Sequence, residues 1–169
     1  MDELNELELN NVRRVLDEYC AAFKQRYKEA LEADGRRASG QLIDNLETEL
    51  RFGGTTITVV LNVADYYKWV ENGRPSGKFP PTDKILKWIK DKPIIPRADK
   101  NGRLPTENQL AFLIGRKIAR EGYEGKPSLS RSVNDVNEVY IEKLRAALDA
   151  DFGAYQLKVL DRINHMLKI

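Results

Sequence analysis

The sequence offers few residues for nucleophilic or metal chemistry. It contains one histidine, His165, and one cysteine, Cys20. A Cys-His or Ser-His-Asp arrangement would have to use His165. Cys20 lies between Tyr19 and Phe23 on an apolar stripe, where a buried structural thiol is the ordinary outcome. A zinc site of histidine and cysteine ligands is excluded for lack of ligands, and no Asp-x-Asp cluster suggests a carboxylate-only magnesium site, which remains open. No cofactor is expected.

Two carboxylates beside an aromatic run are the nearest candidates for acid–base hydrolysis. Asp65 and Glu71 flank residues 66–69. Their six-residue separation places them on different sides of a short helix, which disfavours joint action. We interpret both as surface acids, with Glu71 pairing to a nearby base such as Arg74. No glycine pattern matches a phosphate-binding loop, and no enzyme is expected.

Length and composition favour one soluble domain with a helical appendage. The chain has 169 residues, a net charge of +2 and a single cysteine, which predicts synthesis in a reducing compartment. The first residues are acidic and lack the basic start and apolar core of a signal peptide. No apolar run approaches the roughly 20 residues of a membrane span, so no membrane contact is expected.

Charge is distributed unevenly along the chain. Residues 1–18 contain six acids and two bases, whereas residues 74–103 contain nine bases and three acids. A head-to-tail contact between identical subunits would use such a split, although two solvated faces also explain it. The basic segment is also the basis of an alternative function, nucleic-acid binding, with Phe79 and Trp88 available for stacking. Trp88 is in register with Ile85 and Ile89, so a core position is expected for it.

The first half of the chain predicts a long helix followed by a hairpin. Apolar residues at spacings of three and four predict an amphipathic helix over 3–34. Ser39 can cap a short helix over 40–46. Residues 47–52 and 55–63 read as two strands, and Gly53-Gly54 supplies a two-residue turn between them.

The second half predicts helices separated by loops. A short helix over 64–72 ends at Gly73, Thr82 caps a helix to about Asp91, and Thr106 opens a capping box for a helix that Gly122 closes. Residues 74–81, 92–105 and 123–127 read as loops. A further capping pattern at Ser132 precedes helical spacing almost to the end. Whether this helix is continuous through Gly153, kinked or split there stays open.

These elements predict an α+β fold, with the long N-terminal helix packed on a small antiparallel β-sheet, additional helices and a long C-terminal helical tail. The predicted domains are residues 1–135 and a C-terminal helical extension over 136–169. An amphipathic stripe as long as that of the extension predicts a docking arm.

The run Tyr66-Tyr67-Lys68-Trp69-Val70-Glu71-Asn72-Gly73-Arg74 follows the hairpin directly. It resembles the signature of the small head–tail joining or tail-completion proteins of tailed bacteriophages, also described as neck or minor tail proteins. Pro80-Pro81, the helix around Trp88 and the segment 125–129 follow in the expected order. Ala64-Asp65 departs from a frequent His-Ala pair, and Asn72 replaces a frequent aromatic, so the position within the neck stays open.

The resemblance implies a virion protein of the neck or tail, synthesised in the host cytoplasm. It would form a homo-oligomeric ring that joins the capsid portal to the tail, with portal, connector or tail proteins as partners and DNA passing through the lumen. We expect the interface to use the motif and the loop after it: Tyr66, Tyr67, Trp69, Glu71, Gly73, Arg74, Phe79, Pro80 and Pro81. We expect a basic lumen or docking segment to use Lys78, Lys84, Lys87, Lys90, Lys92, Arg97, Lys100 and Arg103.

Overall fold

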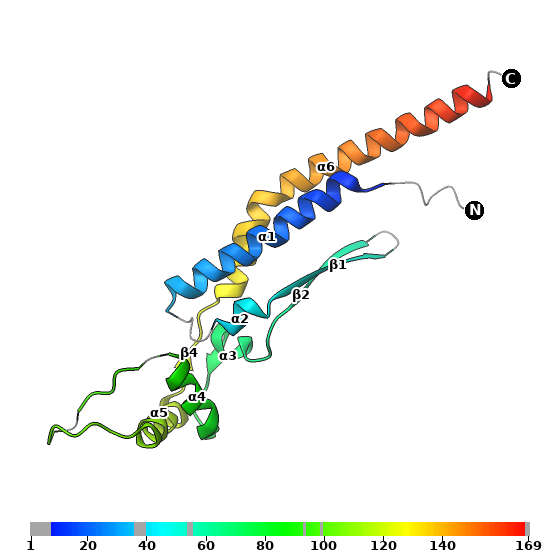
Figure 1. Cartoon of the computed structure of the whole chain (residues 1–169). Helices are drawn as coiled ribbons and strands as arrows, with labels where there is room; N and C mark the ends of the chain where they lie inside the picture. The colour runs from blue at the N-terminus through cyan, green and yellow to red at the C-terminus, as the bar shows by residue number, and fades with distance from the viewer. Residues whose placement is uncertain (1–7, 36–39, 54–55, 93, 99, 168–169) are drawn as a thin grey trace. The chain divides into compact units, whose positions relative to one another are not determined.

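A computed structural model describes residues 8–35, 40–53, 56–92, 94–98 and 100–167. The chain divides into two compact units, and the long helices belong to both (Figure 1). Unit 1 contains residues 1–26 and 132–169, and unit 2 contains residues 27–131.

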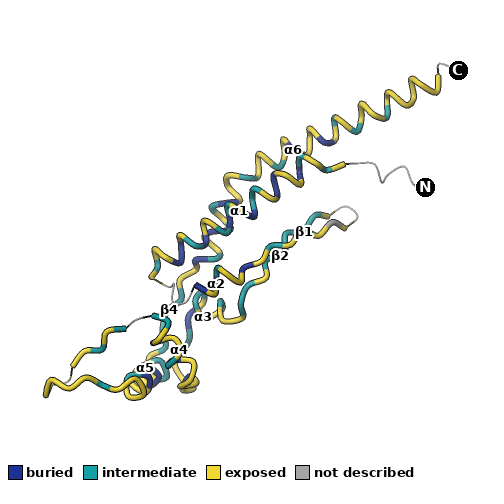
Figure 2. The backbone as a smooth tube through the Cα atoms, viewed as in Figure 1, coloured by how far each residue is buried: buried dark blue, intermediate teal, exposed yellow. Residues whose placement is uncertain are grey.

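Unit 1 is a pair of long helices. Helix α1 covers Asn10–Ala33, and α6 covers Ser128–Met166. The predicted apolar stripe of the N-terminal helix forms the core here, with Val12, Val15, Leu16, Cys20 and Phe23 all buried. Val136 and Ala147 are the buried apolar residues of α6. Because two helices enclose only a narrow core, each keeps a wide exposed face (Figure 2).

Asp151 of α6 holds the start of α1. Its carboxylate accepts hydrogen bonds from the backbone N–H groups of Asn11 at 3.1 Å and Val12 at 2.9 Å, and from the Asn11 side-chain amide at 2.7 Å. Burial raises the pKa of Asp151, but these hydrogen bonds outweigh burial and leave the pKa below its usual value. The carboxylate therefore acts as an N-cap supplied by another helix.

Further polar contacts tie the two helices together towards the other end of the pair. The Tyr19 hydroxyl donates to Asn137 at 2.8 Å, and its ring meets Tyr140 edge-on with 5.8 Å between centroids. Burial, and secondarily Cys20, raises the pKa of Tyr19. Arg26 pairs with Asp135 at 2.6 Å.

Helix α6 is continuous through Gly153 and extends past the N-terminal end of α1 (Figure 1). Gly153 has no positive φ, and a Cβ there would meet nothing within 4 Å. The structure thus answers the open question of continuity at Gly153: α6 is one helix, and one glycine in a long helix costs only about 1 kcal/mol relative to alanine.

Unit 2 begins with the end of α1, a short helix and the hairpin. Helix α2 covers Gln41–Asp44, and strands β1 and β2 cover Glu47–Gly53 and Thr56–Asn62. The strands pair antiparallel from Glu47↔Asn62 to Gly53↔Thr56. Gly53 is thus the last strand residue and not part of the turn. The predicted cap Ser39 and the turn residue Gly54 lie outside the described residues.

Among the described residues of unit 2, two short strands and three helices follow before α6 begins. Helix α3 covers Tyr67–Glu71, β3 Gly73–Arg74, α4 Thr82–Asp91, α5 Glu107–Glu121 and β4 Tyr123–Glu124. Strands β3 and β4 pair antiparallel. Helices α4 and α5 pack through Ile85, Ile89 and Ala111, with Leu110 and Ile114 at the edge of this cluster. The Thr106 capping box of α5 is confirmed, with Gln109 as its second member.

Three local predictions in this half of the chain are wrong. Thr82 is the first residue of α4, and its side chain makes no cap hydrogen bond. Trp88 is 41% exposed, because α4 turns Ile85 and Ile89 inward and leaves the tryptophan at the edge. Helix α6 begins at Ser128 and not near Ser132, which is fully buried inside the helix.

The α+β class, the long helices at both ends and the small antiparallel sheet are confirmed. The compact units do not follow the predicted division at 135–136, because Val12 and Tyr19 of α1 contact Asp151 and Asn137 of α6 within unit 1. No helix in the described part of the chain combines the length and apolar character that a bilayer span requires.

Candidate functional site

Glu71, at the end of α3, caps the start of α6. Its carboxylate accepts hydrogen bonds from the N–H groups of Leu129 and Ser130, both at 2.9 Å, and from the Ser130 hydroxyl at 2.5 Å. These N–H groups belong to the first turn of α6, where no intrahelical acceptor is available. A negative charge at this position also opposes the positive end of the helix dipole. The interpretation of Glu71 as a surface acid is therefore wrong.

Backbone contacts and two glycines join the same segments. Gly73, with φ of +72°, pairs with Glu124, and the Lys126 N–H donates to the Val70 carbonyl at 2.8 Å. A Cβ on Gly73 would collide with the backbone of residues 123–125, and a Cβ on Gly125 with the backbone of residues 71–73. The two segments approach this closely only because both positions are glycine. We call this junction of residues 70–74 with residues 123–130 the α6 clamp.

Asp34 adds a second carboxylate at the same helix start. It accepts a hydrogen bond from the Ser128 hydroxyl at 2.8 Å and pairs with Arg131. Ser128 is fully buried, and the Asp34 side chain is largely buried. Asp34 and Glu71 come from different elements, so the first turn of α6 is fixed from two directions.

Two of the three aromatic residues of the motif, Tyr66 and Trp69, face outward. Tyr66 is 41% exposed and Trp69 is 49% exposed. The Arg74 guanidinium lies 5.5 Å from the Trp69 ring centroid and donates to the Lys78 carbonyl at 2.8 Å. The Trp69–Arg74 pair thus forms a planar, cationic and aromatic surface element, which is held by the backbone of the α6 clamp.

Tyr67 and Tyr27 lie on the inner side of the motif. Tyr67 is half-buried, and Tyr27 at the end of α1 is almost fully buried. Burial, and then the nearby Glu71, Tyr66 and Tyr67, raises the pKa of Tyr27. Burial, followed by Asp44 and Asp91, also raises the pKa of Tyr66. Tyr27 and Tyr66 therefore stay neutral at physiological pH.

The loop after the motif has a packing role on α5. The Phe79 ring lies 5.8 Å from the Phe112 ring, and a Cβ on Gly115 would collide with it. Pro80 is buried, whereas Pro81 is exposed and precedes α4. Glu71, Gly73 and Pro80 therefore serve the fold of unit 2, although the sequence predicted them at a partner interface.

The predicted basic segment is exposed along most of its length. Seven of its eight basic residues are exposed, namely Lys78, Lys84, Lys87, Lys90, Arg97, Lys100 and Arg103. Lys92 is half-buried, donates to the Gly35 carbonyl at 2.6 Å and lies 6.0 Å from the Trp88 ring centroid. Lys90 lies 3.8 Å from Glu107. The segment therefore presents positive charge with one exposed tryptophan among it.

The residues considered for catalysis are not brought together. Cys20 is buried in the core of unit 1, His165 is exposed near the end of α6, and Asp65 is exposed beside α3. Glu71 is already bonded to three donors of α6. Among the described residues, no group of three or more histidine, cysteine, aspartate or glutamate side chains is placed to hold a metal ion.

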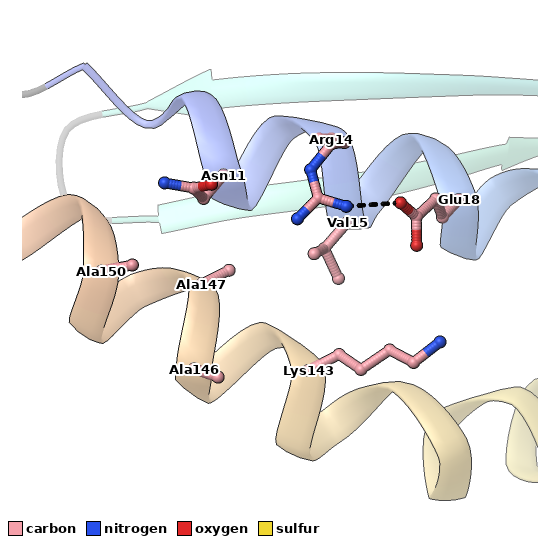
Figure 3. A pocket seen from close by; sticks show the side chains of 8 residues that line it. All are labelled: Asn11, Arg14, Val15, Glu18, Lys143, Ala146, Ala147 and Ala150. Atoms are coloured by element: carbon pink, nitrogen blue, oxygen red, sulfur yellow. Dashed lines mark hydrogen bonds and ion pairs between the residues drawn. The ribbon is translucent and has the colours of Figure 1, made fainter.

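A shallow groove runs between α1 and α6 in unit 1 (Figure 3). Alanine side chains from α6 and Val15 from α1 form its floor, and the Arg14–Glu18 ion pair, at 2.7 Å, lies along its rim. Its volume is about 360 Å³. It is lined by Asn11, Arg14, Val15, Glu18, Lys143, Ala146, Ala147 and Ala150. Its ionisable lining residues are Arg14, Glu18 and Lys143, and the first two pair with each other.

The sequence interpretation missed the caps that come from other elements. Neither Asp151 nor Glu71 is adjacent in sequence to the helix that it caps, so local capping patterns do not reveal them. One local signal was present for α6, since Pro127 stands just before Ser128, and proline is favoured at helix starts.

Comparisons with protein-family models, with curated proteins and with solved structures find no match to this chain. The family resemblance therefore rests on residues 66–74 and on the order of the elements around them. The α6 clamp gives these residues a defined geometry.

Proposed function

We propose that this protein is a non-enzymatic structural subunit of a phage virion. It forms a ring in the neck that joins the capsid portal to the tail, and it acts by oligomerisation and by docking onto portal, connector or tail proteins. It is made in the host cytoplasm and functions in the virion. DNA passes through the lumen of the ring, where the exposed bases of residues 78–103 make non-specific contacts.

One observation supports this proposal most strongly. The motif has its glutamate and glycine engaged within the subunit, while Tyr66, Trp69 and Arg74 lie on the outside. Exposed tryptophan, tyrosine and arginine are the residues most enriched at the energetic centres of protein interfaces. A rigid frame beneath them lowers the entropy cost of binding, because their backbone is already ordered.

The proposal is tested by comparing two exposed tryptophans. We expect Trp69→Ala to reduce ring formation with purified portal or connector protein by tenfold or more, on the scale of an interface hot spot. Trp88→Ala, which truncates a tryptophan of similar exposure on α4, serves as the matched control and keeps ring formation. Equal ring formation by wild type and Trp69→Ala would refute the assignment of the motif to the interface.

Nucleic-acid binding is the second candidate, and the position of Trp88 favours it. Trp88 is exposed, with Lys84 and Lys87 on the same helix and the Lys92 ammonium near its ring. An exposed aromatic ring among lysines can stack on an unpaired base while the lysines meet phosphates. Here Trp88→Ala lowers affinity for single-stranded DNA by about tenfold or more, whereas Trp69→Ala does not. Binding that is insensitive to salt would refute this candidate.

A further inference from the structure

The β1–β2 hairpin of unit 2 has two faces of different character. Its register places Leu50 opposite Val59 and Thr48 opposite Leu61, and these four side chains are half-buried. Because successive side chains of a strand point to opposite faces, the residues between them lie on the other face. That second face carries all the charged side chains of the two strands, and its exposed residues are Glu47, Glu49, Arg51, Thr58 and Asn62.

The outer edge of each strand is open to a further strand. In the described part of the chain, β1 and β2 pair with each other and with no third strand (Figure 1). An antiparallel edge directs the N–H and C=O groups of every second residue away from its partner strand. A two-stranded sheet is marginally stable in water, whereas three or more strands with an apolar face are stable. The hairpin is therefore a template that another strand would complete.

The charges on β1 indicate which strand fits this edge. The Arg51 guanidinium pairs with the Glu49 carboxylate at 2.9 Å, so the two side chains lie on one face within reach of each other. They are 62% and 50% exposed, which leaves both open to a second partner. In an antiparallel pair of two β1 strands centred on Leu50, Glu49 of each copy lies opposite Arg51 of the other. Opposite Cβ atoms are about 4.5–5.5 Å apart, so the four charges alternate in sign around one cluster.

The other pairings of these edges lack this match. A parallel, in-register pair of β1 strands places Glu49 beside Glu49 and Arg51 beside Arg51, and like charges opposite each other are destabilising. Pairings that use the edge of β2 offer no opposite charge, because residues 56–62 contain no charged side chain. The antiparallel β1 pair also keeps Thr48 and Leu50 of both copies on one side, so the apolar face continues across all four strands.

We infer that β1 binds β1 of a second copy of this chain as an antiparallel strand pair. The two hairpins then form a four-stranded sheet in the order β2-β1-β1-β2. The contact is two-fold and therefore closes at two copies. A pair of seven-residue strands buries less surface than a standard interface, so we expect a weak dimer that depends on concentration. The contact uses none of the residues proposed for the ring, and it does not rest on that function.

The first test is sedimentation equilibrium of the full-length protein from about 1 to 300 µM. We expect the mean mass to rise from the 19.4 kDa of one chain towards twice that value. Arg51→Glu should weaken the dimer by about tenfold or more, because carboxylates then face carboxylates across the two-fold axis. The charge swap that combines Glu49→Arg with Arg51→Glu recreates the opposite pairs and should restore the dimer.

Lys68→Glu is the matched control, because it makes the same change of charge at an exposed base outside the hairpin and should keep the dimer. Trp69→Ala should also keep the dimer, which separates this contact from ring formation. A one-chain mass at every concentration would overturn the inference. A charge swap that dimerises as weakly as Arg51→Glu would overturn it as well.

The second test fixes the orientation in a Cys20→Ala background, with the fold checked by circular dichroism. Glu49→Cys and Arg51→Cys variants are mixed and oxidised, and antiparallel pairing gives the disulfide between the two variants. Disulfides within each variant alone indicate parallel pairing and contradict the inference. Thr58→Cys mixed with Val60→Cys is the equivalent pair on β2 and should stay unlinked. Efficient cross-linking there would assign the contact to the edge of β2 and refute the proposed pairing.

Discussion

Glu71 binds Ser130 twice, accepting its backbone N–H at 2.9 Å and its hydroxyl at 2.5 Å. The two residues are 59 positions apart in the sequence. This contact, with the Leu129 N–H on the other carboxylate oxygen, fixes where α6 begins. It gives part of the motif of residues 66–74 a structural role. The docking role that we propose belongs to the aromatic residues of the motif that face outward.

Replacing Glu71 with glutamine should destabilise unit 2. The amide keeps one acceptor oxygen but loses the charge, and its NH₂ group faces donors that it cannot satisfy. We expect Glu71→Gln to lower the free energy of unfolding by about 1–3 kcal/mol, measured by chemical denaturation. Hydrogen exchange of the Leu129 and Ser130 amides should accelerate. Asp65→Asn, at the nearby exposed acid, should change neither measurement.

The Asp151 cap should make stability depend on pH. The folded-state pKa of Asp151 lies below its unfolded value, so its contribution is complete above the unfolded pKa of about 3.9 and is lost as pH falls through the folded pKa. Asp151→Asn should therefore cost about 1–2 kcal/mol near neutral pH. The difference from wild type should shrink below about pH 4.

Its control is Asp149→Asn, which neutralises an exposed acid on the same helix. That variant should unfold like the wild type at neutral pH. A stability gap between wild type and Asp151→Asn that is constant from pH 7 to pH 2 would contradict the capping role of the carboxylate.

Two glycine-to-alanine changes should have opposite signs. Gly73→Ala places a Cβ against the backbone of residues 123–125 at a positive φ, and should destabilise the protein by more than about 1 kcal/mol. Gly153→Ala lies in open space within α6 and should stabilise it by about 0.5–1 kcal/mol. Thermal unfolding monitored by circular dichroism measures both, and a stabilising Gly73→Ala would exclude the close approach of the α6 clamp.

Truncation should separate the part of α6 that packs on α1 from the part that extends beyond it. Removal of residues 153–169 keeps Ala147 and the Asp151 cap, so unit 1 should unfold within about 1 kcal/mol of the wild type. Removal of residues 140–169 takes both away and should unfold the helix pair. Comparable unfolding curves for the two truncations would show that α6 does not support α1.

Much of the fold could be predicted from sequence because its signals are local. The apolar stripe of α1, the β-branched run of β2, the Thr106 capping box and the glycine after α3 all act on their immediate neighbours. The pairing of residues 8–26 with α6 depends instead on Asp151 and on other contacts across more than 100 residues, which periodicity does not encode.

The site was only partly predictable for the same reason. The motif overlaps the segment that forms the α6 clamp. Some of its residues support the fold and others face outward, and the spacing of the residues does not reveal which is which. Glu71 and Gly73 turn inward because a distant helix start and a second glycine, Gly125, meet them. Trp88 follows the register of Ile85 and Ile89 in sequence, yet the narrow α4–α5 contact covers only the two isoleucines.

The central claim is tested most directly by negative-stain imaging and native mass measurement of the wild-type protein, alone and mixed with portal or connector protein. The account predicts closed rings with a hole wide enough for duplex DNA in the mixed sample, and a ring mass that gives the number of subunits. Absence of rings in both samples, with the protein unbound to any connector component, would contradict it.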